Sequence, residues 1–350
     1  MKGRQVPRAG VSEGKHGRRV RPLSPFPLLG HLSETTVELY GVLITYQSPD
    51  ALAYSLQNIY GQHPRRLKQL VVVDNEPGEA GRRLVANYRA RGLTIDYVPT
   101  NENIGPAGAR TLGAQHLLAE ASDDDWVVFF DDRKALPRQS TLTDLAYFAE
   151  QMLSQDPSTA GIALAGARIN LRRARVQMPT IHEFNGPIRV DCLYSNRFPT
   201  FRVGVVRTYG SGDPRFFWGW EDTEYCLRLG EAGYSLYMHG ALWNELREMV
   251  STPGFQHVRL RLETPESRRY YSLRNLIRIL LERGHYVAAA RVALVSGLGK
   301  PLANMPITPR LALDNLKLNV IALRDGITGR MGRTMPMQAR REPFRTFETQ

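Results

Sequence analysis

Two clusters of adjacent carboxylates are the residues in this sequence most able to do chemistry. They are Phe129-Phe130-Asp131-Asp132-Arg133 and Trp218-Gly219-Trp220-Glu221-Asp222. Each stands at the edge of an aromatic or β-branched run, where an ordinary strand would end in Gly, Asn or Ser. Because adjacent carboxylates repel one another, a chain that assembles them usually has a cation or a proton to manage. The pattern favours an enzyme.

The elements that must position these clusters alternate between strand and helix patterns. From about Val37 onward, β-rich runs are followed by helical periodicity, which predicts parallel strands joined by crossover helices. The predicted strands are 40–46, 70–73, 94–98, 126–130, 161–169 and 234–238, and the predicted helices are 49–59, 79–91, 106–120, 142–153 and 224–232. Mixed loops are expected up to residue 206. The fold class is α/β, with a mostly parallel sheet flanked by helices.

Polar side chains follow two of the predicted strands. The apolar run 70–73 ends at Asp74, and the run 126–130 ends at Asp131 and Asp132. In open α/β sheets, ligands collect beyond the carboxyl ends of the strands, so we expect these residues on one ligand-binding edge. The segment 103–110 has Pro at a plausible first helical position and small residues where a helix must approach something closely.

Composition limits the remaining possibilities. With 350 residues, 42% of them hydrophobic, the chain is long enough for one main domain with appendages. We expect a disordered basic arm over 1–36, a catalytic domain over 37–250, a helical extension over 251–330 and a flexible tail over 331–350. The arm inflates the formal charge of +12. No zinc-finger spacing or RNA-binding aromatic signature accompanies that charge, so nucleic acid is not the expected partner.

Two features bear on where the protein works. Two cysteines are too few for a disulfide scaffold, which favours a reducing cytoplasm. The N-terminal residues lack the continuous apolar region of a signal peptide, and no apolar run is long enough to span a membrane. We therefore expect a soluble or peripheral protein.

The order of several short motifs resembles a known family. The segments 43–46, 73–75, 103–110, 130–132 and 216–224 are similar to motifs of the family 2 glycosyltransferases with a GT-A fold, and most similar to the rhamnosyl- and galactofuranosyl-transferase branch. The resemblance covers roughly residues 38–245 and rests on order and spacing together. It implies a Rossmann-like GT-A domain that transfers a sugar, with inversion, from a UDP- or dTDP-sugar to a saccharide or glycolipid acceptor in cell-surface polysaccharide assembly.

The resemblance assigns the donor side to residues at the ends of the first strands. Thr45 and Tyr46 would contact the nucleotide, and Asp74 would accept the imide N–H of a uracil or thymine base. Gly105 would let the backbone approach the ligand, and Arg110 would pair with the diphosphate through its guanidinium fork. The alternative for Asp74 is an Asx-turn or a helix cap. The alternative for the segment 105–110 is an ordinary helix start that contains glycine, with Arg110 in solvent.

The first acidic cluster matches the start of the family's DxD-type motif. There the Asp131-Asp132 pair would hold the ribose and a divalent cation, Mg²⁺ or Mn²⁺, that bridges the diphosphate, with Asp132 as the metal ligand. The sequence departs from the pattern at Arg133, where a third carboxylate is expected. Either Asp132 binds the ion in a shifted geometry, or Arg133 itself neutralises the diphosphate. His239 also lies a few residues too early for a histidine that the family often places near this site.

The second cluster supplies the acceptor side. Asp222 is the expected general base, which removes the proton of the acceptor hydroxyl, and desolvation by aromatic neighbours would raise its pKa. Glu221 is the expected ligand of the acceptor sugar. Trp218 and Trp220 offer faces for stacking on a sugar ring, although one of them could equally lie in the core. The alternative for Glu221 and Asp222 is acidic residues placed favourably at a helix N-terminus.

The segment 268–283 has apolar and Arg residues at helical spacing. It predicts either an amphipathic helix that holds the enzyme at the inner face of a membrane carrying a polyprenyl-linked acceptor, or a helix packed on the catalytic domain with its arginines in solvent.

Two other classes of protein compete with a glycosyltransferase. A non-catalytic nucleotide-sugar-binding assembly partner is favoured by Arg133 and by the missing histidine. A nucleotidyltransferase would need a Gly- and Lys/Arg-rich loop after the first strand, and residues 45–49 do not provide one.

Overall fold

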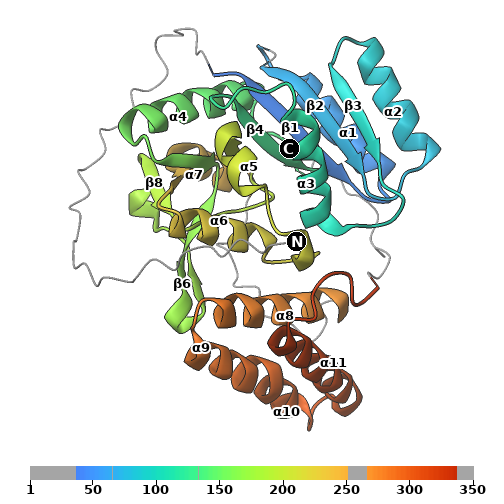
Figure 1. Cartoon of the computed structure of the whole chain (residues 1–350), viewed down its shortest axis with the longest axis vertical. Coiled ribbons are helices and arrows are strands. Elements are labelled where there is room, and N and C mark those ends of the chain that lie inside the picture. The colour runs from blue at the N-terminus through green and yellow to red at the C-terminus, as the bar shows by residue number, and fades with distance from the viewer. Residues whose placement is uncertain (1–36, 65, 133, 251–265, 337–350) are drawn as a thin grey trace, which may run out of the picture.

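The main domain is built around one large sheet. The computed structural model describes residues 37–64, 66–132, 134–250 and 266–336 (Figure 1). The predicted basic arm, Arg133 and most of the predicted tail lie outside the described residues. The sheet has eight strands in the order β3-β2-β1-β4-β10-β5-β11-β8, and a second sheet has the order β7-β6-β9.

The element bounds are as follows. The large sheet contains β1 (Leu39–Thr45), β2 (Leu67–Asp74), β3 (Ile95–Pro99), β4 (Trp126–Asp131), β5 (Thr159–Ala163), β8 (Pro187–Val190), β10 (Thr200–Arg202) and β11 (Ser235–His239). The small sheet contains β6 (Gly166–Asn170), β7 (Arg175–Gln177) and β9 (Cys192–Leu193). The helices of this domain are α1 (Pro49–Tyr60), α2 (Glu79–Ala90), α3 (Gly105–Leu117), α4 (Thr141–Gln155), α5 (Val203–Tyr209), α6 (Glu221–Glu231) and α7 (Gly240–Val250), with 3₁₀ turns η1 (Leu171–Arg173), η2 (Ile181–Glu183) and η3 (Pro214–Phe216).

The central strands are apolar along nearly their whole length because helices cover both faces of the sheet. β1 pairs in parallel with β2 on one side and with β4 on the other. The register sets Thr45 beside Asp74 and Ile44 beside Asp131. The carboxyl ends of these strands therefore meet at one edge, as expected from the sequence.

Three expectations about the second half of the domain are wrong. The predicted strand 161–169 is two strands, since β5 belongs to the large sheet and β6 to the small one. The chain changes sheets at Leu164 and Ala165, which are buried and give no turn signal. The predicted loops up to residue 206 include β7 to β10 and most of α5, and α6 begins at Glu221 instead of at Glu224.

The C-terminal extension is helical, as predicted, and lies below the main domain in Figure 1. It consists of α8 (Glu266–Glu282), α9 (Tyr286–Arg291), the π-helical segment η4 (Val292–Gly299), α10 (Lys300–Asn304) and α11 (Pro309–Thr328). A second apolar core joins α8 to η4 and α11 and includes Phe217 of the main domain. No helix in the described part of the chain is both long and apolar enough to cross a membrane.

Helix α8 does not present an amphipathic face to a membrane. Ten of its residues are buried, and among them are Arg269 and Arg274. The helix packs against the main domain, as the alternative interpretation had it, but these arginines lie inside the protein and not in solvent. Residues 331–336 also contact α8, because the Tyr271 hydroxyl donates to the Met335 carbonyl at 2.6 Å.

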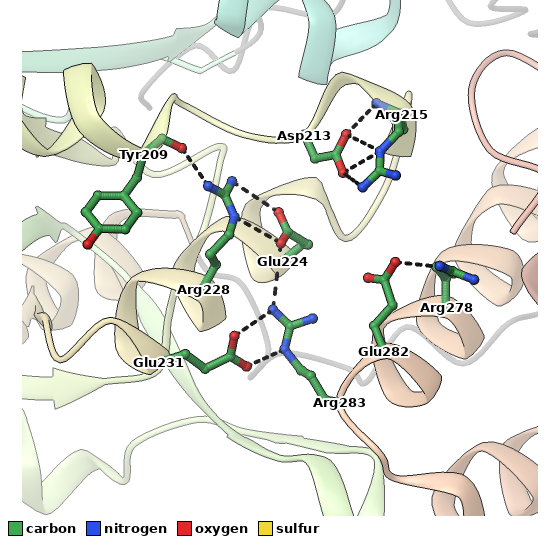
Figure 2. A network of polar contacts seen from close by, with 9 residues as sticks. All are labelled: Tyr209, Asp213, Arg215, Glu224, Arg228, Glu231, Arg278, Glu282 and Arg283. Carbon is green, nitrogen blue, oxygen red and sulfur yellow. Dashed lines mark hydrogen bonds and ion pairs between the residues drawn. The ribbon is translucent and has the colours of Figure 1, made fainter. Parts of the chain in front are cut away.

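Ion pairs attach the extension to α6 (Figure 2). Arg283, directly after α8, pairs with Glu231 at 2.6 Å and reaches Glu224 at 3.7 Å. Glu224 is also paired with Arg228 at 3.2 Å, and Arg228 donates to the carbonyl of Tyr209. The network therefore joins the extension to the helix that begins with Glu221.

Candidate active site

The carboxylates at the strand ends are held by neighbouring strands. Asp132 directly follows β4, and its Oδ2 accepts a hydrogen bond from the Thr45 hydroxyl at 3.0 Å. Both residues are buried. Tyr46, which follows Thr45 in the chain, is half-buried. The structure thus brings the predicted residues at the ends of β1 and β4 together.

Asp74 is enclosed by protein on two sides. Its Oδ2 accepts from the Tyr97 hydroxyl at 2.7 Å, and its Oδ1 accepts from the Glu76 N–H at 3.4 Å in an Asx-turn arrangement. Gly81 in α2 is required here because a Cβ would lie 2.6 Å from Oδ2. Burial raises the pKa of Asp74, against the effect of the Tyr97 hydrogen bond. The local contacts fit the Asx-turn alternative, and recognition of a base by Asp74 stays a prediction.

Two cations that the sequence analysis did not select lie near Asp131. Burial, and then the charge of Arg197, lower the pKa of Lys134, whereas Asp131 acts in the opposite direction. Burial also lowers the pKa of Arg197, and Asp131 again opposes it. The first acidic cluster therefore stands beside two partly desolvated positive charges.

The second cluster forms the first turn of α6. Asp222 is half-buried, and its Oδ1 accepts from the Thr223 N–H at 2.7 Å while its Oδ2 accepts from the Ser195 N–H at 3.2 Å. Glu221 is buried, and its Oε1 lies 3.4 Å from Nη1 of Arg110, which is also buried. Burial, followed by the charge of Asp222, raises the pKa of Glu221 to about 7, although Arg110 opposes the shift.

The start of α3 presses against the loop before α6. Gly105 has a φ of +73°, and a Cβ there would lie 2.3 Å from the carbonyl oxygen of Phe217. The Ala107 N–H donates to the same carbonyl at 3.4 Å. The close approach predicted for this segment is therefore made to protein backbone. The arginine of this helix, Arg110, likewise contacts Glu221 and does not extend into solvent.

The two tryptophans of the loop differ in their contacts. Trp218 packs on the second apolar core, and the Arg268 guanidinium lies 5.4 Å from its ring centroid. Trp220 is half-exposed, has a φ of +66° and precedes α6 directly. A core role thus accounts in part for Trp218, and stacking of a sugar on either ring stays a prediction.

A short segment connects the two acidic clusters. The Ser195 N–H contacts Asp222, and two residues further on Arg197 is within electrostatic reach of Asp131. Residues two positions apart are separated by at most about 7 Å between Cα atoms. The segment 195–197 therefore contacts the second cluster and lies within electrostatic reach of the first.

His239 has a structural role in this fold. Its Nδ1 accepts the N–H of Leu242 at 3.3 Å in the first turn of α7, and its ring lies 4.7 Å from that of Phe148. Burial lowers its pKa to about 4, so the imidazole is neutral at neutral pH. Among the described residues, no group of three or more His, Cys, Asp and Glu side chains is arranged to hold a metal ion. Adjacent carboxylate oxygens such as those of Asp131 and Asp132 still fit a hard cation whose other ligands come from phosphate and water.

A separate cavity of about 350 Å³ lies beside the small sheet. None of the predicted site residues lines it. Its lining residues are Arg168, Ile169, Asn170, Leu171, Arg172, Gln177, Asp191 and His285.

The sequence is similar to a known protein family and to two curated relatives. The model of the family "Glycosyl transferase family 2" matches residues 42–153. The galactofuranosyltransferase GlfT1 of Mycobacterium tuberculosis (strain ATCC 25618 / H37Rv) is 26% identical over 278 residues, covering 71% of this chain and 84% of the relative. GlfT1 of Mycolicibacterium smegmatis (strain ATCC 700084 / mc(2)155) is 25% identical over 258 residues, covering 69% and 83%.

A solved structure shares the fold. The crystal structure of GalNAc-T7 with UDP, GalNAc and Mn²⁺ superposes with a TM-score of 0.50 at 14% identity, over 71% of this chain and 48% of that one. This chain thus spans about half the length of that protein. The likeness agrees with a GT-A fold, in which a mostly parallel sheet is flanked by helices and here is followed by a helical extension.

Fold and site together define a glycosyltransferase with a GT-A domain. Residues 42–153 carry the family 2 glycosyltransferase domain, and the chain is similar to galactofuranosyltransferases over about 70% of its length.

Sequence reasoning missed several residues of the site. Ser195, Lys134 and Arg197 lie in segments without periodicity, and Asn275, whose contacts are described below, lies on a helix of the extension. No local signal marks any of them. Their place follows from tertiary packing alone.

Proposed function

We propose that this protein transfers a sugar, with inversion, from a UDP- or dTDP-linked donor to a saccharide or polyprenyl-linked glycolipid acceptor in cell-surface polysaccharide assembly. Galactofuranose is the first sugar to test, because it is the sugar in the name of the curated relatives. The observation that carries the proposal is the segment 195–197, whose Ser195 N–H binds Asp222 and whose Arg197 is within electrostatic reach of Asp131. A donor's diphosphate at the first cluster would thereby stand close to a base at the second.

Asp222 acts as the general base in this proposal. The acceptor hydroxyl oxygen attacks the anomeric carbon, the bond from that carbon to the diphosphate oxygen breaks, and Asp222 takes the hydroxyl proton. Two backbone N–H groups orient the carboxylate, at 2.7 Å from Thr223 and 3.2 Å from Ser195. Because Oδ1 also accepts from the Thr223 hydroxyl at 3.3 Å, Oδ2 is the oxygen that keeps a lone pair for the acceptor. Burial and the pair with Arg110 make Glu221 the less accessible of the two acids.

The leaving diphosphate meets positive charge on the other side of the site. Lys134 and Arg197 are partly desolvated, which strengthens their attraction for phosphate oxygens. A divalent cation held by Asp131 and Asp132 would supply further neutralisation of the diphosphate. Thr45 keeps the Asp132 carboxylate oriented through the hydrogen bond to its Oδ2.

Calorimetry with UDP and dTDP, with and without Mn²⁺, tests the donor side. We expect binding of one nucleotide at least about tenfold tighter with Mn²⁺, because a bridging cation offsets the repulsion between carboxylates and diphosphate. A screen of nucleotide sugars for donor hydrolysis then identifies the sugar. Binding without any hydrolysis or transfer would favour a non-catalytic nucleotide-sugar-binding protein, and absence of binding would contradict both functions.

The proposal includes contact with an anionic membrane surface, made by α9 to α11. Among the described residues, every exposed large hydrophobic side chain except Ile181 lies on this part of the extension. Val287 is 84% exposed and Ile307 is 78% exposed. On α11 an outward stripe interleaves apolar and basic side chains with one acid, Asp314; the others are Arg310, Leu313, Lys317, Val320, Ile321, Arg324 and Ile327. A face of apolar residues mixed with cations suits an anionic bilayer interface.

Sedimentation with lipid vesicles tests this contact. We expect the protein to sediment with vesicles of phosphatidylcholine and phosphatidylglycerol, and less with phosphatidylcholine alone. The variant Val287→Ser/Leu294→Ser/Ile307→Ser should lower partitioning at least about tenfold, because each apolar side chain contributes to insertion, while Ile181→Ser, outside this face, leaves it unchanged. A wild-type dimer that ignores vesicles and becomes monomeric in the triple variant would make the face an interface between copies, and the membrane contact would be wrong.

A further inference from the structure

One asparagine of the extension holds the loop that carries both tryptophans. Asn275 lies in the middle of α8 and has no exposed surface. Its Nδ2 donates to three loop carbonyls, those of Phe216 at 2.9 Å, Trp218 at 3.0 Å and Gly219 at 2.7 Å. Since an amide has only two N–H groups, one of them is shared between two carbonyls.

Arg274 fixes the orientation of that amide. Its Nε donates to Oδ1 of Asn275 at 2.9 Å, which leaves the NH₂ group facing the loop. Its Nη2 donates to the Phe216 carbonyl at 3.1 Å. The guanidinium is buried, with its centre 4.8 Å from the Tyr271 ring centroid. Asn275 therefore binds the loop from within the core, whereas Arg274 also donates to the Gly332 carbonyl and the Thr334 hydroxyl.

The loop needs this outside support because its backbone is strained. Phe217 has a φ of +58° and Trp220 a φ of +66°, and each non-glycine residue in this region costs about 1–3 kcal/mol. Gly219, at +79°, tolerates the same region without that cost. Such conformations persist only when surrounding contacts determine them. The contacts here come from α3, through the Phe217 carbonyl, and from α8, through Asn275 and Arg274.

The loop in turn sets the position of the acids. Trp220 directly precedes Glu221, and its carbonyl accepts the Glu224 N–H at 2.8 Å in the first turn of α6. A change in the loop backbone would therefore move the first turn of α6, where Asp222 lies. We infer that Asn275 is a positioning residue, through which the C-terminal extension holds the loop 216–220 and the first turn of α6 in the geometry that transfer requires. The inference rests on the proposed role of the Glu221-Asp222 cluster.

Kinetics of Asn275→Ala test the inference. We expect kcat to fall about 10²-fold, because a misplacement of about 1 Å has an effect of that size, while affinity for UDP in calorimetry stays within about twofold. The kcat of Asn275→Asp should fall by a similar factor, because the carboxylate has the same shape as the amide but cannot donate a hydrogen bond. Acrylamide should quench tryptophan fluorescence more strongly in both variants, since two of the four tryptophans lie in the loop and Trp126 and Trp243 are buried.

The matched control is Asn319→Ala. Asn319 is also buried and donates to a backbone carbonyl, that of Gly297 at 2.7 Å, but both partners lie within the extension. The Asn319→Ala variant should lose about as much thermal stability as Asn275→Ala, and its kcat and acrylamide quenching should stay at wild-type values. If Asn319→Ala loses as much kcat at an equal loss of Tm, or if Asn275→Ala keeps wild-type kcat, the inference is wrong.

The result is separable from the fate of the proposed base. Loss of kcat in Asn275→Ala together with an active Asp222→Asn variant would keep the positioning role and reject Asp222. An inactive Asp222→Asn variant together with a fully active Asn275→Ala variant would keep Asp222 as the base and reject the positioning role of Asn275.

Discussion

Asp222→Asn should lower kcat for sugar transfer by about 10²–10⁴-fold, the usual contribution of a general base. The amide keeps the shape of the carboxylate and its acceptor oxygen, so the hydrogen bond from Ser195 or Thr223 can remain, but it cannot take the acceptor proton. Affinity for the donor nucleotide should stay unchanged, because that binding is assigned to the other acidic cluster. Steady-state kinetics combined with calorimetry on the same preparation measure both quantities.

Two further variants of α6 define what this result means. Glu231→Gln, at the exposed end of the helix, serves as the control and should keep transfer near the wild-type rate, because Arg283 keeps its pair with Glu224. Glu221→Gln tests the rival base, since the raised pKa of Glu221 is also suited to proton transfer. Near-normal turnover in Asp222→Asn, with a loss in Glu221→Gln, would move the role of base to the buried acid.

The large sheet was predictable because its central strands are buried on both faces. β1, β2 and β4 begin or end within three residues of their predicted bounds, since parallel strands covered by helices are continuous apolar runs. The common edge at which these strands end followed from the residues at which the apolar runs stop, Asp74 and Asp131. The break between β5 and β6 was missed because the run through Leu164 and Ala165 stays apolar where the chain changes sheets.

The bounds of α6 show a different limit of sequence patterns. Its first residue follows Trp220, which is in the left-handed region and makes no side-chain cap, so no capping residue marks the start and the acidic first turn is the start signal present. The helix begins where it does because Gly105 and Asn275 hold the preceding loop. These contacts join positions separated by more than fifty residues, for example Asn275 and Gly219, which are 56 apart.

The partners of the acids were equally inaccessible to local patterns. Arg110 and Glu221 were each selected from a motif, one for the diphosphate and one for the acceptor, but their sequence separation of 111 hides that they meet. The pair connects the helix assigned to the donor with the cluster assigned to the acceptor. Contact of either residue with substrate stays a prediction. Their contact with each other should affect the free energy of unfolding.

Arg110→Met should lower the free energy of unfolding by about 3–5 kcal/mol at pH 8, because it leaves Glu221 buried without its cation. The loss should be smaller at pH 5.5, where Glu221 is protonated and no buried charge remains. In the wild-type chain, between about pH 4.5 and pH 7, Glu221 is protonated in the folded state and ionised in the unfolded state. The contribution of Glu221 to stability therefore falls as the pH rises from about 4.5 to about 7.

Urea unfolding at both pH values, followed in a double-mutant cycle, measures these effects. Arg110→Met/Glu221→Gln should recover most of the stability that Arg110→Met loses at pH 8, because both buried charges are then gone. Arg83→Met, which removes the exposed pair with Glu79, should change little at either pH. A loss that is the same at both pH values, or a double variant that loses the sum of the single losses, would mean that the buried pair does not couple α3 to α6. Recovery in the double variant would instead identify the pair as the electrostatic link between the two halves of the site.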